Sequence, residues 1–77
     1  MWFTYLLTCS DDSLYCGITN NLEKRIETHN NGKGSKLLRG SKLPVKIYKF
    51  WEFETKSEAA KEEYRIKQLT RKQKLEL

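Results

Sequence analysis

The chain has little cysteine, histidine or proline, and its apolar runs are short. Two cysteines, Cys9 and Cys16, are too few for a disulfide scaffold, and with a single histidine they cannot supply the four ligands of a structural zinc site. No apolar run approaches the roughly 20 residues that a membrane-spanning helix requires, and residues 1–3 carry no sign of a secretion signal. We therefore expect a cytoplasmic protein with reduced cysteines and no membrane partner, associated with the nucleoid if the source is a bacterium.

The size of the chain limits its architecture. Seventy-seven residues (9.2 kDa) leave room for one domain, residues 1–77, because so short a chain buries only about 60% of the surface that it exposes when unfolded. Hydrophobic residues make up 38% of the sequence, and the two Trp, three Phe and four Tyr predict a small aromatic core. This composition argues against intrinsic disorder.

Positive charge is concentrated in the middle of the chain. Residues 21–50 contain eight Lys or Arg and two Glu, a net charge of +6, whereas residues 1–20 carry −2 and residues 51–77 carry +1. A localised basic surface suits a polyanion such as nucleic acid. The alternative that charge alone leaves open is an ordinary solvated surface.

Local patterns predict the order of the secondary structure. Alternating apolar residues predict strands over residues 2–9, 14–18 and 45–53, the last with Val45, Ile47, Trp51 and Phe53 on one face. Capping signals predict helices over residues 21–30 and 58–69, and a short helix after Thr70. A basic loop spans residues 33–43, and Pro44 closes it.

The register of the first hairpin decides where two tyrosines point. With a two-residue loop, Tyr5 and Tyr15 lie on opposite faces of the sheet. With a three-residue loop over residues 11–13, Tyr15 lies opposite Cys9 and shares a face with Tyr5. The sequence leaves both registers open.

Three charged or titratable residues interrupt the apolar stripes of the helices. A helical wheel places Arg25 and His29 on or beside the stripe of the first helix, and Glu63 within that of the second. The structural explanations are a hydrogen-bonded histidine at the core edge, an arginine lying along the stripe, and an ion pair between Glu63 and Arg25. The functional explanation is a polar site, since an inward carboxylate is costly unless it is paired or binds a cation.

These residues resemble a known family when they are taken in order. Phe3-Thr4-Tyr5-Leu6-Leu7, Tyr15-Cys16-Gly17-Ile18-Thr19, Asn21-Leu22-Glu23-Lys24-Arg25 with His29, and finally Glu63 resemble a stand-alone GIY-YIG endonuclease domain. The resemblance covers nearly the whole chain and is closest to the small branch related to the Slx1-type structure-specific nucleases. Of the two motifs that name the family, the chain retains Tyr5, Tyr15 and Gly17.

The resemblance implies a fold, a reaction and roles for five residues. The fold is α+β, a three-stranded antiparallel sheet flanked by helices, and the reaction is hydrolysis of a DNA phosphodiester with one divalent metal ion. Glu63 would hold Mg²⁺ or Mn²⁺, and Arg25 would bind the scissile phosphate. Tyr5 and Tyr15 would orient and deprotonate the attacking water, with His29 as hydrogen-bonding partner or proton relay, and either tyrosine could be the base.

The basic loop is the expected contact with the DNA backbone. Its four basic residues are Lys33, Lys36, Arg39 and Lys42. Its Gly-Lys-Gly-Ser-Lys segment lacks the spacing of a nucleotide-binding phosphate loop, so nucleotide binding is rejected. Two other classes remain open, a non-catalytic nucleic-acid-binding module of the same fold and a protein-interaction domain. The DNA form, whether branched or single-stranded, the targeting partner and the oligomeric state are not determined by the sequence.

Overall fold

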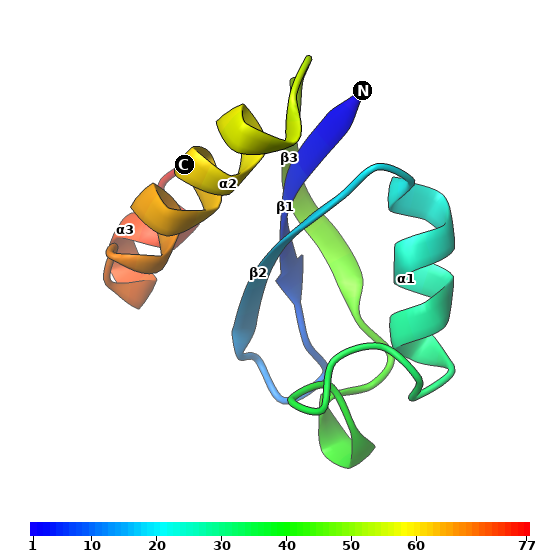
Figure 1. The fold of residues 1–77 in the computed structure, drawn as a ribbon. Helices are drawn as coiled ribbons and strands as arrows, with labels where there is room; N and C mark the ends of the chain where they lie inside the picture. The colour runs from blue at the N-terminus through cyan, green and yellow to red at the C-terminus, as the bar shows by residue number, and fades with distance from the viewer.

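A computed structural model describes residues 1–77 as three strands, three α-helices and one 3₁₀ turn (Figure 1). The elements, in chain order, are β1 (Trp2–Thr8), β2 (Leu14–Thr19), α1 (Leu22–Asn30), the 3₁₀ turn (Gly40–Lys42), β3 (Lys46–Phe53), α2 (Lys56–Lys67) and α3 (Arg71–Leu75). The α+β fold class and the order of the elements are as predicted from the sequence. None of the three helices has both the length and the apolar character needed to cross a membrane.

The sheet is antiparallel, with β1 between β2 and β3. Tyr15 pairs with Leu7, and the last pair of the hairpin is Thr8 with Leu14. The loop has five residues, so neither of the two loop lengths left open by the sequence is found, and Tyr15 does not pair with Cys9 as it would with a three-residue loop. Two extra residues preserve the alternation of faces, so Tyr5 and Tyr15 still share one face.

The turn of this hairpin is held by its aspartates. Asp12 has φ 68°, and the Asp11 carboxylate accepts a hydrogen bond from the Ser13 amide at 3.1 Å.

A bulge in β3 changes which side chains share a face. Ile47 pairs with Leu7 and Trp51 pairs with Thr4, so these two β3 residues lie on opposite faces, and the register shifts between Leu6 and Leu7. The predicted single apolar face of this strand is wrong, because an extra residue in one strand inverts the alternation beyond it.

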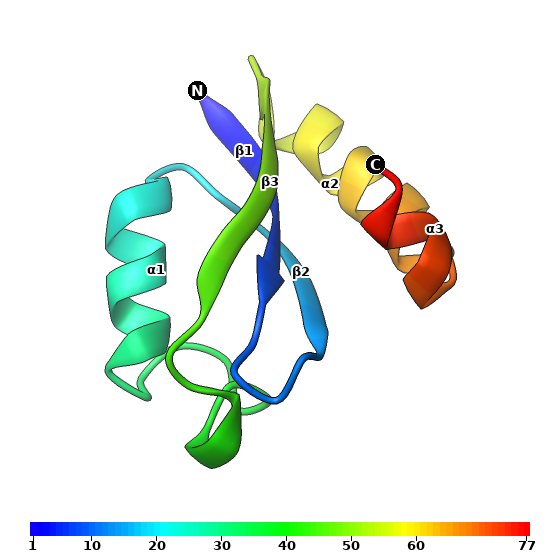
Figure 2. The same cartoon turned by 180° about the vertical axis from the view of Figure 1, so that it is seen from behind.

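Helices cover both faces of the sheet, and each face carries a separate core. On the face covered by α1 and the loop before β3, Tyr5, Leu7, Cys9, Leu38 and Val45 are buried together. On the other face, Leu6 and Cys16 pack against Ile66 of α2. Figure 2 shows α1 and α2 on opposite sides of the sheet, with the outer edge of β3 uncovered.

Capping residues and polar anchors set the positions of the helices. Asn21 caps α1 by accepting from the Lys24 amide at 3.1 Å, while Thr55 and Thr70 open α2 and α3 with complete capping boxes. The Thr4 hydroxyl donates to the carbonyl of the fully buried Ala59 at 2.7 Å, which ties α2 to β1.

Candidate functional site

Three ring side chains from separate elements meet on the α1 face of the sheet. The ring centroids of Tyr5 and Tyr15 are 6.3 Å apart, and the His29 centroid lies 6.0 Å from Tyr5 and 5.5 Å from Tyr15. Tyr5 Oη and His29 Nε2 are 2.9 Å apart and buried. The shared face of the two tyrosines, one of the two arrangements that the sequence left open, is thus the observed one.

Gly17 provides the space for the Tyr5 ring. It lies directly across from Tyr5 in the sheet, and a Cβ at this position would be 2.5 Å from the Tyr5 hydroxyl oxygen and 2.7 Å from Cζ. Any larger residue would therefore displace the phenol. The glycine of the second motif is explained by this contact within the protein.

The loop after α1 closes over the remaining side of His29. The Ser35 amide donates to His29 Nδ1 at 3.3 Å, and Gly34 packs against the imidazole, which is only 1% exposed. The sequence reasoning missed both residues, because it considered this glycine- and serine-containing segment only as a phosphate loop. No local pattern marks Gly34, because its contact with His29 arises only where the loop returns to α1.

Burial changes the proton affinities of this group. Burial, followed by the neighbouring Tyr15, raises the pKa of Tyr5 far above its usual value, while Arg25 opposes the shift. Burial, and then the charge of Arg25, lowers the pKa of His29. A neutral imidazole is therefore the form expected at neutral pH.

Arg25 lies beside the ring cluster and has an exposed side chain. It lines a polar pocket of about 330 Å³ together with Thr19, at the end of β2, and Thr28 of α1. None of the ion pairs in the structure includes Arg25, so its guanidinium is available to an anion.

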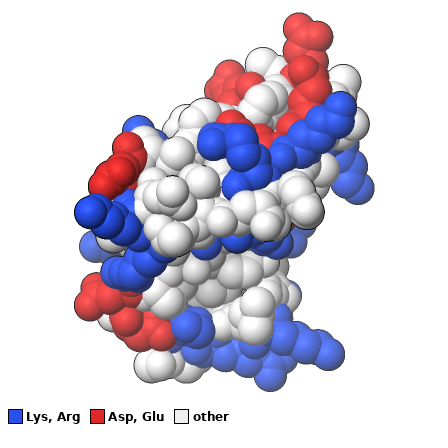
Figure 3. Space-filling view, turned by 90° about the vertical axis from the view of Figure 1, so that its left-hand side faces the viewer, with Lys and Arg blue, Asp and Glu red and all other residues white.

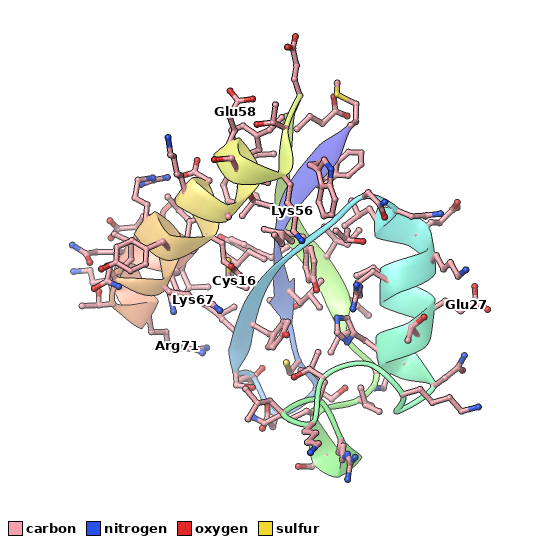
Figure 4. All side chains as sticks on the ribbon, viewed as in Figure 1. Cys16, Glu27, Lys56, Glu58, Lys67 and Arg71 are labelled. Atoms are coloured by element: carbon pink, nitrogen blue, oxygen red, sulfur yellow. The ribbon has the colours of Figure 1, made fainter.

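Glu63 lies on α2, across the sheet from α1, and its side chain is 24% exposed. It pairs with Lys67 at 3.3 Å, so the alternative ion pair with Arg25 is not formed. Burial, followed by the charge of Glu63, raises the pKa of Cys16 on β2 to about 11, and the same charge adds a small part to the raised pKa of Tyr5, which burial mainly causes. α2 packs against β2 through Ile66 and Cys16, and Figure 4 shows Lys67, the ion-pair partner of Glu63, on the side of α2 next to β2.

No ready-made metal site exists in the chain. The structure contains no group of three or more His, Cys, Asp or Glu side chains close enough to hold one ion. Glu63 is a hard oxygen donor, and substrate phosphate oxygens and water can complete the shell of a cation such as Mg²⁺. The residues present thus fit an ion that binds together with its substrate.

The four basic residues of the loop do not share one environment. Lys33, Lys36 and Arg39 are exposed, whereas Lys42 pairs with Asp11 at 2.9 Å and also donates to Ser13 Oγ at 3.0 Å. Figure 3 shows basic side chains gathered at the lower end of the molecule, where Figure 1 places this loop. Lys42 fastens the loop to the β1–β2 hairpin, and the other three remain free for a ligand.

Comparison with known proteins identifies the class of this fold and site. The profile of the GIY-YIG catalytic domain matches residues 1–76. The chain therefore belongs to the GIY-YIG family, whose domains are nucleases, as the resemblance of the sequence motifs indicated.

Similar proteins within that family include UPF0213 proteins. One from Clostridium perfringens is 58% identical over 77 residues, which is all of this chain and 82% of that protein. The solution NMR structure of a UPF0213 protein from Bacillus halodurans superposes with a TM-score of 0.59 at 40% identity, covering 96% of this chain and 79% of that one. A protein from E. faecalis, also solved by NMR, gives a TM-score of 0.64 at 45% identity, over 96% and 78% of the two chains.

Proposed function

We propose that the protein is a DNA endonuclease that hydrolyses phosphodiester bonds with one divalent metal ion. The observation that supports this most strongly is the buried hydrogen bond between Tyr5 and His29 at 2.9 Å, with Tyr15 packed beside both rings. Arg25, which forms no ion pair, lies one turn before His29 on α1, and α2 carries Glu63 on the other face of the sheet. A cation, an arginine and a phenol around one phosphate are the groups that phosphodiester hydrolysis requires.

The side chains divide the reaction between them. Arg25 binds the scissile phosphate and stabilises the charge that develops on its non-bridging oxygens. Tyr5 is the general base that we assign, because it alone of the two tyrosines is hydrogen-bonded to His29. The Tyr5 hydroxyl first loses its proton to solvent, and the phenolate then takes a proton from the attacking water as the new P–O bond forms. The bridging P–O bond breaks, its oxygen leaves with a proton taken from solvent, and Tyr15 orients the attacking water.

Glu63 is the metal ligand in this proposal. A bound Mg²⁺ or Mn²⁺ would neutralise phosphate charge and favour ionisation of the nearby groups. Lys67 forms an ion pair with the Glu63 carboxylate, and this ion pair has to break when a metal ion binds to Glu63. We expect weak metal affinity without DNA, because the chain contributes a single carboxylate.

The DNA contact extends from the site along the free loop residues. Lys33, Lys36 and Arg39 contact phosphates, and contacts of this kind carry no sequence information. A small nuclease with sequence-independent contacts suits a substrate recognised by shape, such as the branched or flapped DNA of repair and recombination. A protein partner would then direct it to its target, and the cytoplasm or nucleoid is the expected location.

An activity screen tests the proposal. The protein is incubated with branched, flapped, duplex and single-stranded DNA and with RNA, in Mg²⁺, in Mn²⁺ or in EDTA, and the products are separated on denaturing gels. We expect cleavage of at least one DNA substrate that EDTA abolishes and that Arg25→Ala strongly reduces. Binding without cleavage under every condition would favour the non-catalytic nucleic-acid-binding module, and absence of binding would favour a protein-interaction domain.

A further inference from the structure

The segment after α1 encloses the one histidine of the chain. A Cβ at Gly34 would lie 2.8 Å from His29 Cε1 and 3.0 Å from Cγ, and closer still to Nδ1. These atoms belong to a ring that is 1% exposed, held against the sheet by Tyr5 on its other side. The imidazole therefore cannot turn away without moving the loop, and only glycine allows the loop to come this close.

The backbone of the same segment decides which ring nitrogen carries the proton. The Ser35 amide can only donate, and it points at His29 Nδ1 at 3.3 Å, so Nδ1 has to be the acceptor. A proton on Nδ1 would face another N–H group, which disfavours both the Nδ1-protonated tautomer and the imidazolium. The single proton of a neutral imidazole is then on Nε2, 2.9 Å from the Tyr5 hydroxyl oxygen.

We propose that Gly34 and Ser35 are positioning residues that fix His29 in its Nε2-protonated tautomer, so that His29 donates a hydrogen bond to Tyr5 and does not accept one. The assignment of the tautomer rests on the geometry alone, and its consequence for catalysis rests on the proposed nuclease function.

The direction of this bond determines what Tyr5 can do. An N–H that donates to the phenol oxygen stabilises the phenolate, and it leaves the hydroxyl proton free to depart away from His29. The opposite tautomer would accept a hydrogen bond from the Tyr5 hydroxyl and so stabilise the neutral phenol. His29 is then a fixed donor that supports ionisation of a buried phenol, and not a relay that first removes its proton.

The positioning segment is flanked by two proposed DNA contacts. Lys33 and Lys36 stand on either side of Gly34 and Ser35 and are exposed. A phosphate bound by these lysines would hold the loop in the position that orients His29. Residues 33–36 would thus both bind the substrate and orient the histidine that supports the general base.

Nitrogen NMR of histidine tests the assignment without any assay of cleavage. Because the chain has one histidine, labelling with ¹⁵N-histidine gives one pair of ring signals, in which the unprotonated nitrogen resonates far downfield of the protonated one. We expect Nδ1 to be the unprotonated nitrogen at neutral pH in the wild-type protein. A protonated Nδ1, or rapid averaging of the two tautomers, would overturn the proposal even if the protein cleaves DNA.

Two substitutions at one position separate the amide from the side chain. Ser35→Pro removes the N–H donor and should shift the signals toward the other tautomer or toward averaging, whereas Ser35→Ala keeps the donor and should leave them unchanged. Ser35→Ala also removes the Ser35 Oγ contact with the Leu37 amide, so it controls for general loosening of the loop. An unaltered tautomer in a folded Ser35→Pro protein would contradict the proposal. If that variant does not fold, the wild-type spectrum alone decides.

Discussion

At the scale of single residues, the site depends on two glycines that make room for reactive rings. Gly17 accommodates the Tyr5 phenol, and Gly34 accommodates His29. The family motifs identified Tyr5, and His29 was identified because it interrupts the apolar stripe of the first helix. Gly34 could not be identified in the same way, since its role depends on a loop that returns to α1 through contacts that no local pattern encodes.

The buried histidine makes stability depend on pH. Burial lowers its pKa in the folded state below the value of about 6.5 expected when unfolded, so the unfolded chain binds the proton more readily. The stabilisation is complete above pH about 6.5 and is lost as the pH falls from there toward the folded-state pKa. We expect urea unfolding to show a lower free energy at pH 5.5 than at pH 7.5.

His29→Gln provides the control, because it removes the titrating ring. The decrease in the free energy of unfolding between the two pH values should be smaller in this variant than in the wild-type protein. Equal decreases in both proteins would show that carboxylates cause the whole effect and that His29 titrates alike in both states.

At the scale of secondary-structure elements, local sequence signals were sufficient to predict which helices and strands form and in what order. They were not sufficient to predict the register of the strands. The capping signals at Thr55 and Thr70 are the N-caps of α2 and α3, since capping involves residues close in sequence, although α2 begins at Lys56, two residues before the predicted start at residue 58. The hairpin loop and the bulge in β3 depend on pairing between distant residues. The loop therefore has neither of the two lengths that the sequence left open, and the predicted single apolar face of β3 is wrong. β3 also carries Lys46 and Lys49 along its uncovered edge, which disfavours pairing with other chains.

The cap of α2 supports the helix that carries Glu63. Thr55→Ala should lower the free energy of unfolding by about 1 kcal/mol, because the Glu58 amide loses its acceptor at 3.2 Å. Thr28→Ala is the matched control. Its hydroxyl donates to the Lys24 carbonyl within α1, where alanine is the better helix former, so we expect no loss. Equal effects of the two substitutions, measured by urea unfolding, would contradict the role of the cap.

At the scale of the whole molecule, some of the excess basic residues are exposed and unpaired, and others form ion pairs that stabilise the fold. Lys42 belongs to an ion pair with Asp11, which the charge pattern could not reveal, while Lys33 and Lys36 are exposed. The double variant Lys33→Ala with Lys36→Ala should reduce the slope of log affinity against log salt by roughly 0.7–0.9 for each DNA phosphate that the protein no longer neutralises.

A second pair of lysines away from the loop controls for net charge. Lys49 lies on β3 and Lys61 on α2, and both are exposed. Replacing these two with alanine removes the same charge and should leave the salt slope close to that of the wild-type protein. Equal slopes for the two double variants, in fluorescence anisotropy titrations with labelled DNA, would locate the DNA contact elsewhere.

Glu63 is the proposed ligand of the catalytic metal, and its neighbour on α2 gives a closely matched comparison. Glu62 is also half-buried and also forms an ion pair within the helix, with Arg65, as Glu63 does with Lys67. Each change to glutamine removes one carboxylate and one pair of this kind, so both should alter the free energy of unfolding by less than about 1 kcal/mol.

The most direct test is therefore Mn²⁺-dependent DNA cleavage by Glu63→Gln and Glu62→Gln, on preparations whose unfolding has been measured. We predict that Glu63→Gln reduces the cleavage rate by about a hundredfold or more, while Glu62→Gln stays close to the wild-type rate and both variants bind DNA normally. Cleavage by Glu63→Gln at the rate of Glu62→Gln would contradict the assignment of Glu63 as the metal ligand.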